Sequence, residues 1–195
     1  MSVFDTFKNM TGGTIKAQKI NPAGDTELKS WTFTFDKLPE TLAELKAHDI
    51  CDLTKPQNTA AMLVLAYCAY KKDKKESLAM IDFLNGPSPL TENDKQLLDE
   101  RFSESHGYIP FSYFEGASPQ NNYMPDRPYR LVIKEFTRSR YELNIGYYML
   151  YLQSSGAESD RYIKLKLKPS TGEWFIYEPF IMVGVRRPDS MDPWA

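Results

Sequence analysis

One segment of this chain is apolar on every side of the helix that it would form. From Asn58 to Tyr70 the sequence reads NTAAMLVLAYCAY, so apolar residues occupy every position around a helical turn. A helix without a polar face must be enclosed by other elements. Pro56 suits the first turn of such a helix, and the lysine-rich stretch 71–75 ends the apolar pattern. We therefore predict a central buried helix around which the rest of the chain packs.

Three further helices are predicted, one before this segment and two after it. Pro39 suits the first turn of one helix, and Gly86 followed by Pro87 is a typical stop signal for another. Thr91 and Asp94 resemble the capping box that begins the last helix. The apolar residues that recur at helical spacing are Leu38, Leu42, Leu45, Leu78, Ile81, Leu84, Leu97, Leu98 and Phe102.

The last third of the chain alternates with a period of two, which is typical of half-buried strands. In the clearest case, residues 163, 165 and 167 are aliphatic, and lysines occupy 164, 166 and 168. A final strand is expected from Ile181 to Val185, after Pro179. Because short turns join these segments, we predict an antiparallel meander of four or five strands with the helices on its apolar face.

The N-terminal region also shows strand patterning. Trp31, Phe33 and Phe35 alternate with polar residues, and Thr14–Ile20 could pair with this segment as a hairpin. The whole pattern predicts one α+β domain over 1–195. Its expected parts are N-terminal strands at 1–37, a helical part at 38–105, a long loop at 106–129, an antiparallel sheet at 130–187 and a tail at 188–195.

Composition excludes several classes of protein. The chain of 195 residues has a net charge of −2, unlike a generically cationic binder of nucleic acid or membranes. Its 2 cysteines exclude a disulfide scaffold, and its N-terminus lacks the pattern of a signal peptide. We expect a soluble cytoplasmic protein. Its 26 aromatic residues (12 Tyr, 11 Phe and 3 Trp) against 2 His favour a surface that packs or binds over histidine-based catalysis.

Several landmarks together resemble an uncharacterised bacterial family of unknown function. They are TAAMLVLAYCAY, FLNGPSPL, SYFEGASPQNNYMPDRPY, SSGAESDRYIKL and the terminal DPWA, and the resemblance extends from Leu38 to Ala195. It implies no activity. The turn at Gly156–Arg161 departs from the Gly-Ala-Asp-Ser-Pro-Arg run of that family. At the level of the fold alone, helices followed by a meander with Gly172 and Trp174 are similar to the nuclear-transport-factor-like cone.

The unpatterned loop 106–129 is the first candidate site. Long loops without periodicity are uncommon in compact domains and are often functional. Rigid loops that carry rings and amides make good contact surfaces. The alternative is that the loop is structural and that its rings cover one end of the sheet. The candidate binding residues in this loop are Tyr113, Glu115, Asn121, Asn122, Tyr123 and Tyr129.

The tail adds Arg186 and Trp194 to the candidate site. A tryptophan beside a chain end is unusual unless that end is held in place. We expect Trp194 to fold back onto the domain, and the alternative is that it reaches a partner chain.

These observations favour a binding or interaction module for a protein or a small ligand. One alternative is an enzyme with a pocket lined by Tyr147, Tyr151 and Trp174, in which Glu115 or Glu178 acts as acid or base. Another is a homodimer that pairs through sheet faces or edges.

Two classes of ligand are not favoured. Three outward lysines with Tyr162 could hold single-stranded nucleic acid, but they are also what a half-exposed strand needs. His48, Cys51, Cys68 and His106 lack the spacing of a zinc site, and no cofactor is predicted.

Overall fold

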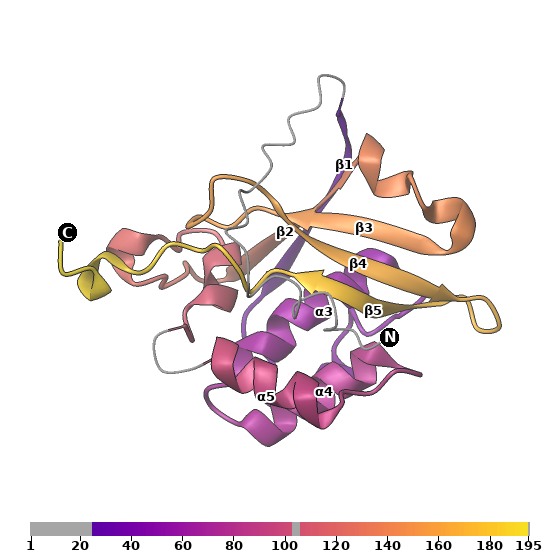
Figure 1. The fold of residues 1–195 in the computed structure, drawn as a ribbon, viewed down its shortest axis with the longest axis horizontal. Coiled ribbons are helices and arrows are strands. Elements are labelled where there is room, and N and C mark those ends of the chain that lie inside the picture. The colour runs from indigo at the N-terminus through magenta and orange to yellow at the C-terminus, as the bar shows by residue number, and fades with distance from the viewer. Residues whose placement is uncertain (1–24, 103–105, 195) are drawn as a thin grey trace.

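The computed structural model describes residues 25–102 and 106–194, and these form an α+β fold, as predicted. All four described α-helices lie on one side of a five-stranded antiparallel sheet (Figure 1). The strands are β1 (Glu27–Phe35), β2 (Tyr129–Phe136), β3 (Tyr147–Leu152), β4 (Arg161–Lys168) and β5 (Glu173–Phe180), in the order β1-β2-β3-β4-β5. The helices are α2 (Leu42–Ala47), α3 (Pro56–Ala69), α4 (Lys74–Asn85) and α5 (Glu92–Arg101).

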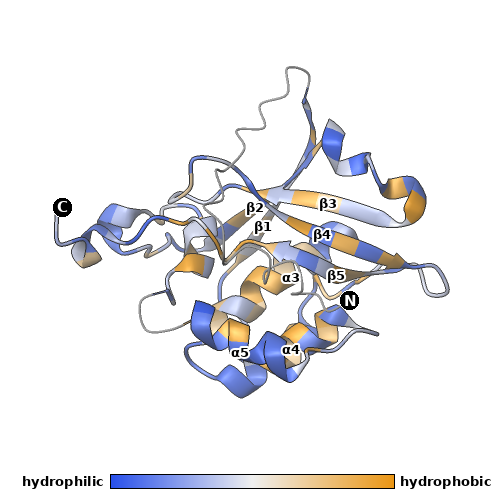
Figure 2. Ribbon diagram, in the orientation of Figure 1, coloured by the Kyte–Doolittle hydropathy of each residue, from blue (hydrophilic) through white to orange (hydrophobic). Residues whose placement is uncertain are grey.

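Helix α3 is the centre of the core, which confirms the prediction made from its apolar surface. Every residue from Ala60 to Tyr67 is buried. The helix packs against α4 and against strands β2 to β5, and Figure 2 shows its strongly hydrophobic character. Thr59 Oγ1 joins α3 to the sheet by donating to the Trp174 carbonyl at 3.1 Å, and Ser77 Oγ joins α4 to α3 by donating to the Ala66 carbonyl at 2.7 Å.

The strand alternation places two different surfaces on the sheet. The face toward the helices carries buried aliphatic residues such as Ile133, Leu150 and Ile163. We call the other side the open face, because the described α-helices leave it uncovered (Figure 1). Its side chains are mainly rings and cations: Phe136, Tyr147, Met149, Tyr151, Tyr162, Lys164, Lys166, Tyr177 and Phe180.

Only the second strand of the predicted N-terminal hairpin lies within the described residues. Its first strand, Thr14–Ile20, lies outside the described residues. The second is β1, which pairs antiparallel with β2, with Trp31 opposite Ile133. The pairing joins segments about one hundred positions apart, so no local signal in the sequence could indicate it.

Two predicted boundaries are wrong. Pro39 does not open a helix: α2 begins at Leu42, because the Thr41 hydroxyl accepts a hydrogen bond from the Glu44 amide at 3.1 Å and caps the first turn. Ile181–Val185 is not a strand, and Pro179 instead lies within β5 opposite Ile163. Proline is tolerated there because β5 is the last strand of the described sheet, where one side of the backbone needs no partner.

Other predicted helix ends are confirmed. Thr91 and Asp94 form the reciprocal capping box at the start of α5, with backbone-to-side-chain hydrogen bonds of 2.8 and 3.2 Å. Gly86 ends α4 with a positive φ of 56°. No described helix has the length and apolar character that crossing a membrane requires.

Candidate functional site

The 106–129 loop folds into two short 3-10 helices, η1 (Ile109–Tyr113) and η2 (Pro119–Asn121), and holds the chain that follows β5. Tyr113 Oη donates to the Ile181 carbonyl at 2.5 Å, and Tyr123 Oη donates to the Arg186 carbonyl at 2.7 Å. Both rings are buried, and Tyr123 stacks on Tyr108 with centroids 4.9 Å apart. Burial raises the pKa of both phenols, that of Tyr123 to about 12. Tyr113 and Tyr123 therefore stabilise the fold from inside.

Asn121 organises the turn of the loop itself. Its Oδ1 accepts hydrogen bonds from the backbone amides of Ser118, at 2.9 Å, and Met124, at 3.2 Å. Its Nδ2 donates to the carbonyls of Gly116, at 2.7 Å, and Met124, at 3.0 Å. All four hydrogen-bonding positions of this amide are thus used within the loop.

Asn122 and Arg186 link the loop to the tail. Asn122 has a left-handed backbone, and its Oδ1 accepts a hydrogen bond from Ser190 Oγ at 2.5 Å. Ser190 belongs to a last 3-10 turn, η5 (Asp189–Met191), whose Asp189 carboxylate accepts from the Arg186 guanidinium at 2.8 Å. The loop and the tail are therefore neighbours, as the candidate site requires.

The expectation that Trp194 folds back is wrong. The residue is 93% exposed, and the C-terminus points away from both the sheet and the helices (Figure 1). Its described hydrogen bond is local, from its backbone amide to Asp192 Oδ1 at 2.9 Å. The contacts that hold the tail in place extend only as far as η5, which precedes the tryptophan.

Glu115 and Tyr129 lie where the loop joins β2. Glu115 is half-exposed and lies 3.6 Å from the Arg130 guanidinium. Tyr129 is partly buried against the edge of Phe114, and its hydroxyl accepts a hydrogen bond from Arg127 at 3.0 Å. Tyr129 also lines a cavity beside the C-terminal end of α3.

A second cavity has a volume of about 400 Å³. It lies between strands β3 and β4 and the connection 137–146, which contains η3 (Thr137–Arg140) and η4 (Leu143–Ile145). We call it the tyrosine pocket, because four of its lining residues are tyrosines. The lining consists of Arg138, Ser139, Tyr141, Glu142, Tyr147, Tyr148, Met149, Tyr151 and Lys164.

The charges of the tyrosine pocket are paired within the molecule. Lys164 Nζ lies 2.5 Å from Glu142 Oε2 and 4.9 Å from the centroid of Tyr147. Arg138 lies over the Tyr151 ring at 4.2 Å and forms an ion pair with Asp25 at 2.8 Å. A ligand in this pocket would therefore contact ring faces and side chains whose charges are already paired.

A buried acid lies close to this pocket. Glu135 is on the helix side of β2 and forms an ion pair with Arg140. Burial by itself would raise the pKa of Glu135, but hydrogen bonds from Arg140 and Tyr148 outweigh burial and hold it below the ordinary value. Burial and the neighbouring carboxylate raise the pKa of Tyr148. At neutral pH the carboxylate is thus charged and the phenol protonated, which suits a structural network.

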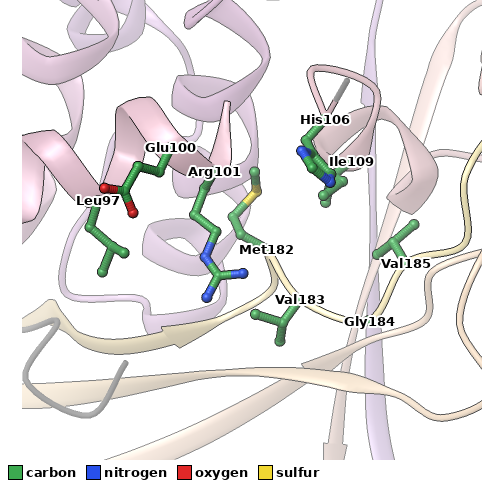
Figure 3. Close-up of a pocket in the computed structure, with 9 residues that line it drawn as sticks. All are labelled: Leu97, Glu100, Arg101, His106, Ile109, Met182, Val183, Gly184 and Val185. Atoms are coloured by element: carbon green, nitrogen blue, oxygen red, sulfur yellow. The ribbon is translucent and has the colours of Figure 1, made fainter. Parts of the chain in front are cut away.

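A third cavity, of about 310 Å³, is lined by three polar side chains that are close in sequence, Glu100, Arg101 and His106. Figure 3 shows Arg101 reaching into it between Glu100 and His106. Burial, followed by the charges of Arg187 and Arg101, lowers the pKa of His106. The positive charge of Arg101 thus makes the protonated form of His106 less favourable.

The three residues named for the pocket of the enzyme alternative do not line one pocket together. Tyr147 and Tyr151 lie on the open face, whereas Trp174 packs against Tyr148, with centroids 5.7 Å apart, on the helix side. Glu178 accepts a hydrogen bond from Tyr162 at 2.5 Å. In the described part of the chain, no group of three or more His, Cys, Asp or Glu residues is placed to hold a metal ion.

The connection 137–146 was missed at the level of sequence. The predicted sheet region 130–187 includes this connection, although the run TRSRYELNIG lacks a strand period and ends in a glycine. Three of its large side chains are exposed: Tyr141 by 73%, Leu143 by 40% and Ile145 by 64%. The signal available in the sequence was the missing strand period of this run.

Comparison with curated proteins finds no match, and comparison with solved structures finds none either. The expected likeness to the nuclear-transport-factor-like cone therefore stays a prediction. The resemblance to an uncharacterised family is confirmed by a family model that matches residues 37–189. The chain belongs to the family described as Domain of unknown function (DUF6935).

Proposed function

We propose that this protein is a binding module that recognises a polypeptide through the tyrosine pocket and the neighbouring connection 137–146. The observation that supports this proposal is the exposure of Tyr141, Leu143 and Ile145 beside an aromatic cavity. Soluble proteins rarely leave large apolar side chains clustered in water unless the surface binds something. Aromatic residues, methionine and arginine are also enriched at protein interfaces, and all three line this pocket.

The pocket suits one apolar side chain. Tyrosine rings offer large, rigid contact area, and the flexible thioether of Met149 adapts to the shape of a guest. Because Lys164 and Arg138 already have carboxylate partners, the guest needs no net charge. A strongly anionic partner such as nucleic acid is not favoured for the same reason.

The partner that we propose is a second copy of this chain. A twofold interface must be self-complementary, so one surface must carry both a projecting group and the cavity that receives it. Ile145 projects from η4, outside the lining of the pocket, and the pocket lies next to it. Two copies related by a twofold axis can therefore exchange Ile145 side chains, while their internally paired charges avoid repulsion.

We place the dimer in the bacterial cytoplasm. Cys51 and Cys68 are free, as is usual where thiols are kept reduced.

Sedimentation equilibrium tests this proposal over concentrations from about 1 μM to about 1 mM, a range that detects weak dimers. We expect the wild-type mass to rise from monomer to dimer. Ile145→Glu should weaken the dimer at least about tenfold, because a carboxylate would have to enter an apolar cavity. Met124→Glu is the matched control: Met124 is 66% exposed on the 106–129 loop, outside the lining of the tyrosine pocket, and its substitution should leave the mass unchanged.

A wild-type chain that stays monomeric throughout this range overturns the proposed self-association. Equal weakening by both glutamate variants would show that added charge, and not the loss of Ile145, is responsible. Circular dichroism of each variant confirms that it is folded, which is expected because both residues are largely exposed.

A further inference from the structure

A separate cavity of about 370 Å³ lies where three distant segments meet. They are the connection between β1 and α2, the C-terminal end of α3 and the 106–129 loop. We call this cavity the basic pocket. Its lining consists of Lys37, Leu38, Pro39, Glu40, Cys68, Ala69, Lys71, Lys72, Phe111, Arg127 and Tyr129.

The basic pocket is cationic in a chain whose net charge is negative. Its lining has four cations and one carboxylate, whereas the whole chain carries a net charge of −2. Lys72 pairs with Glu40 at 2.5 Å, and Lys37 pairs with Glu44, just outside the lining, at 3.0 Å. Among the described residues, Lys71 and Arg127 have no ion-pair partner. The positive charge of these two side chains is therefore uncompensated locally.

Arg127 makes two contacts with one residue, Tyr129. It donates to Tyr129 Oη at 3.0 Å, and its guanidinium carbon lies 5.1 Å from the centroid of the same ring. Tyr129 is in turn fixed by Phe114, whose ring meets it edge-on with centroids 5.7 Å apart. The cation is thus partly ordered before any ligand arrives, which lowers the entropic cost of binding.

Lys71 is also confined. A Cβ added to Gly107 would lie 2.9 Å from both Cγ and Cε of Lys71, so the lysine stem lies directly against that glycine. Its ammonium is not needed to satisfy the end of α3, because the Ala69 carbonyl already accepts from the amides of Lys72, at 3.0 Å, and Asp73, at 2.9 Å.

The floor of the pocket is apolar and uncharged. Leu38, Pro39, Ala69 and Phe111 supply hydrocarbon and one ring. Burial raises the pKa of the Cys68 thiol, so this residue adds no negative charge at neutral pH. A small organic molecule could place an apolar body on this floor while its charged group faces the cations at the rim.

We infer that the basic pocket binds a small organic anion, a carboxylate or a phosphate monoester with an apolar body. Its anionic group would accept hydrogen bonds from Lys71 and Arg127, and its apolar part would cover Phe111 and Leu38. This site is independent of the tyrosine pocket, with which it shares no lining residue.

Backbone amide NMR of the full chain tests this inference with four probes. Phenyl phosphate and benzoate carry both a ring and a charge, inorganic phosphate carries the charge alone, and phenol carries the ring alone. We expect phenyl phosphate or benzoate to shift the amides of Lys71, Phe111 and Tyr129, and the stronger of the two identifies the anionic group. Phenol and inorganic phosphate should bind at least about tenfold more weakly, because each loses one half of the contacts.

A matched pair of double variants tests the role of the two cations. Lys71→Gln with Arg127→Gln should weaken the preferred probe at least about tenfold. Lys75→Gln with Lys168→Gln removes the same charge outside the pocket and should leave affinity unchanged. The inference is overturned by an absence of shifts at millimolar probe or by equal weakening in the two double variants. Ile145→Glu should leave this binding intact, which separates it from the proposed dimer.

Discussion

Two tyrosine hydroxyls of the 106–129 loop hold the chain that follows β5 by one hydrogen bond each. Tyr113 and Tyr123 each donate to a backbone carbonyl more than sixty positions away in sequence. The segment that receives them is not a strand, so these carbonyls have no sheet ladder to satisfy them. Side-chain donors from the loop therefore replace the hydrogen bonds that regular structure would supply.

Tyr113→Phe should lower the free energy of unfolding by about 1–2 kcal/mol, because it leaves the buried Ile181 carbonyl without its donor. Urea denaturation measures this loss. Tyr141→Phe removes a hydroxyl from a residue that is 73% exposed and should change stability by less than about 0.5 kcal/mol. Equal stability of the two variants would contradict the role assigned to the Tyr113 hydroxyl.

At the scale of elements, glycine ends helix α4 for two reasons. Gly86 has a positive φ of 56°, which residues other than glycine rarely adopt. It is also covered by Phe175 of β5: an added Cβ would lie within 2.3 Å of that ring. The end of α4 is thus shaped both by its own backbone and by contact with the sheet.

Gly86→Ala should lower the free energy of unfolding by more than about 2 kcal/mol, since backbone strain and overlap with Phe175 act together. Gly172→Ala is the matched control. Gly172 also has a positive φ, of 72°, but an added Cβ would meet nothing within 4 Å. Its substitution should therefore cost only the backbone strain, about 1 kcal/mol. Comparable chemical denaturation midpoints for the two variants would show that the contact with Phe175 is unimportant.

At the scale of the whole molecule, α3 joins the helical layer to the sheet. It packs against α4 on one side and against four of the five strands on the other. Because both layers share this helix, we expect them to unfold together as one cooperative unit.

Leu63→Ala should test that coupling. Leu63 is fully buried near the middle of α3, so its truncation should cost about 2–5 kcal/mol through lost burial and a residual cavity. Thermal unfolding followed by far-ultraviolet circular dichroism and by tryptophan fluorescence should give coincident transitions at a lower midpoint. Two separate transitions would divide the chain into independently folding parts and contradict the predicted single domain.

The sequence by itself determined the elements whose signals are local. The all-round apolar surface of α3, the capping box of Thr91 and Asp94 and the period-two pattern of β4 each depend on neighbouring residues. Such patterns can be interpreted without knowing the topology, because hydrogen bonding and side-chain direction repeat along one element.

The tertiary structure alone decided which of these side chains meet. The enzyme alternative places Tyr147 and Trp174 in one pocket, but they lie on opposite faces of the sheet, since strand pairing fixes the face that each residue occupies. Rings of the 106–129 loop were candidate ligand contacts, and two of them are buried against the segment after β5. Lys71 and Arg127 are fifty-six positions apart and line the same pocket. That pocket follows from the packing of α3 against the loop, which no local periodicity encodes.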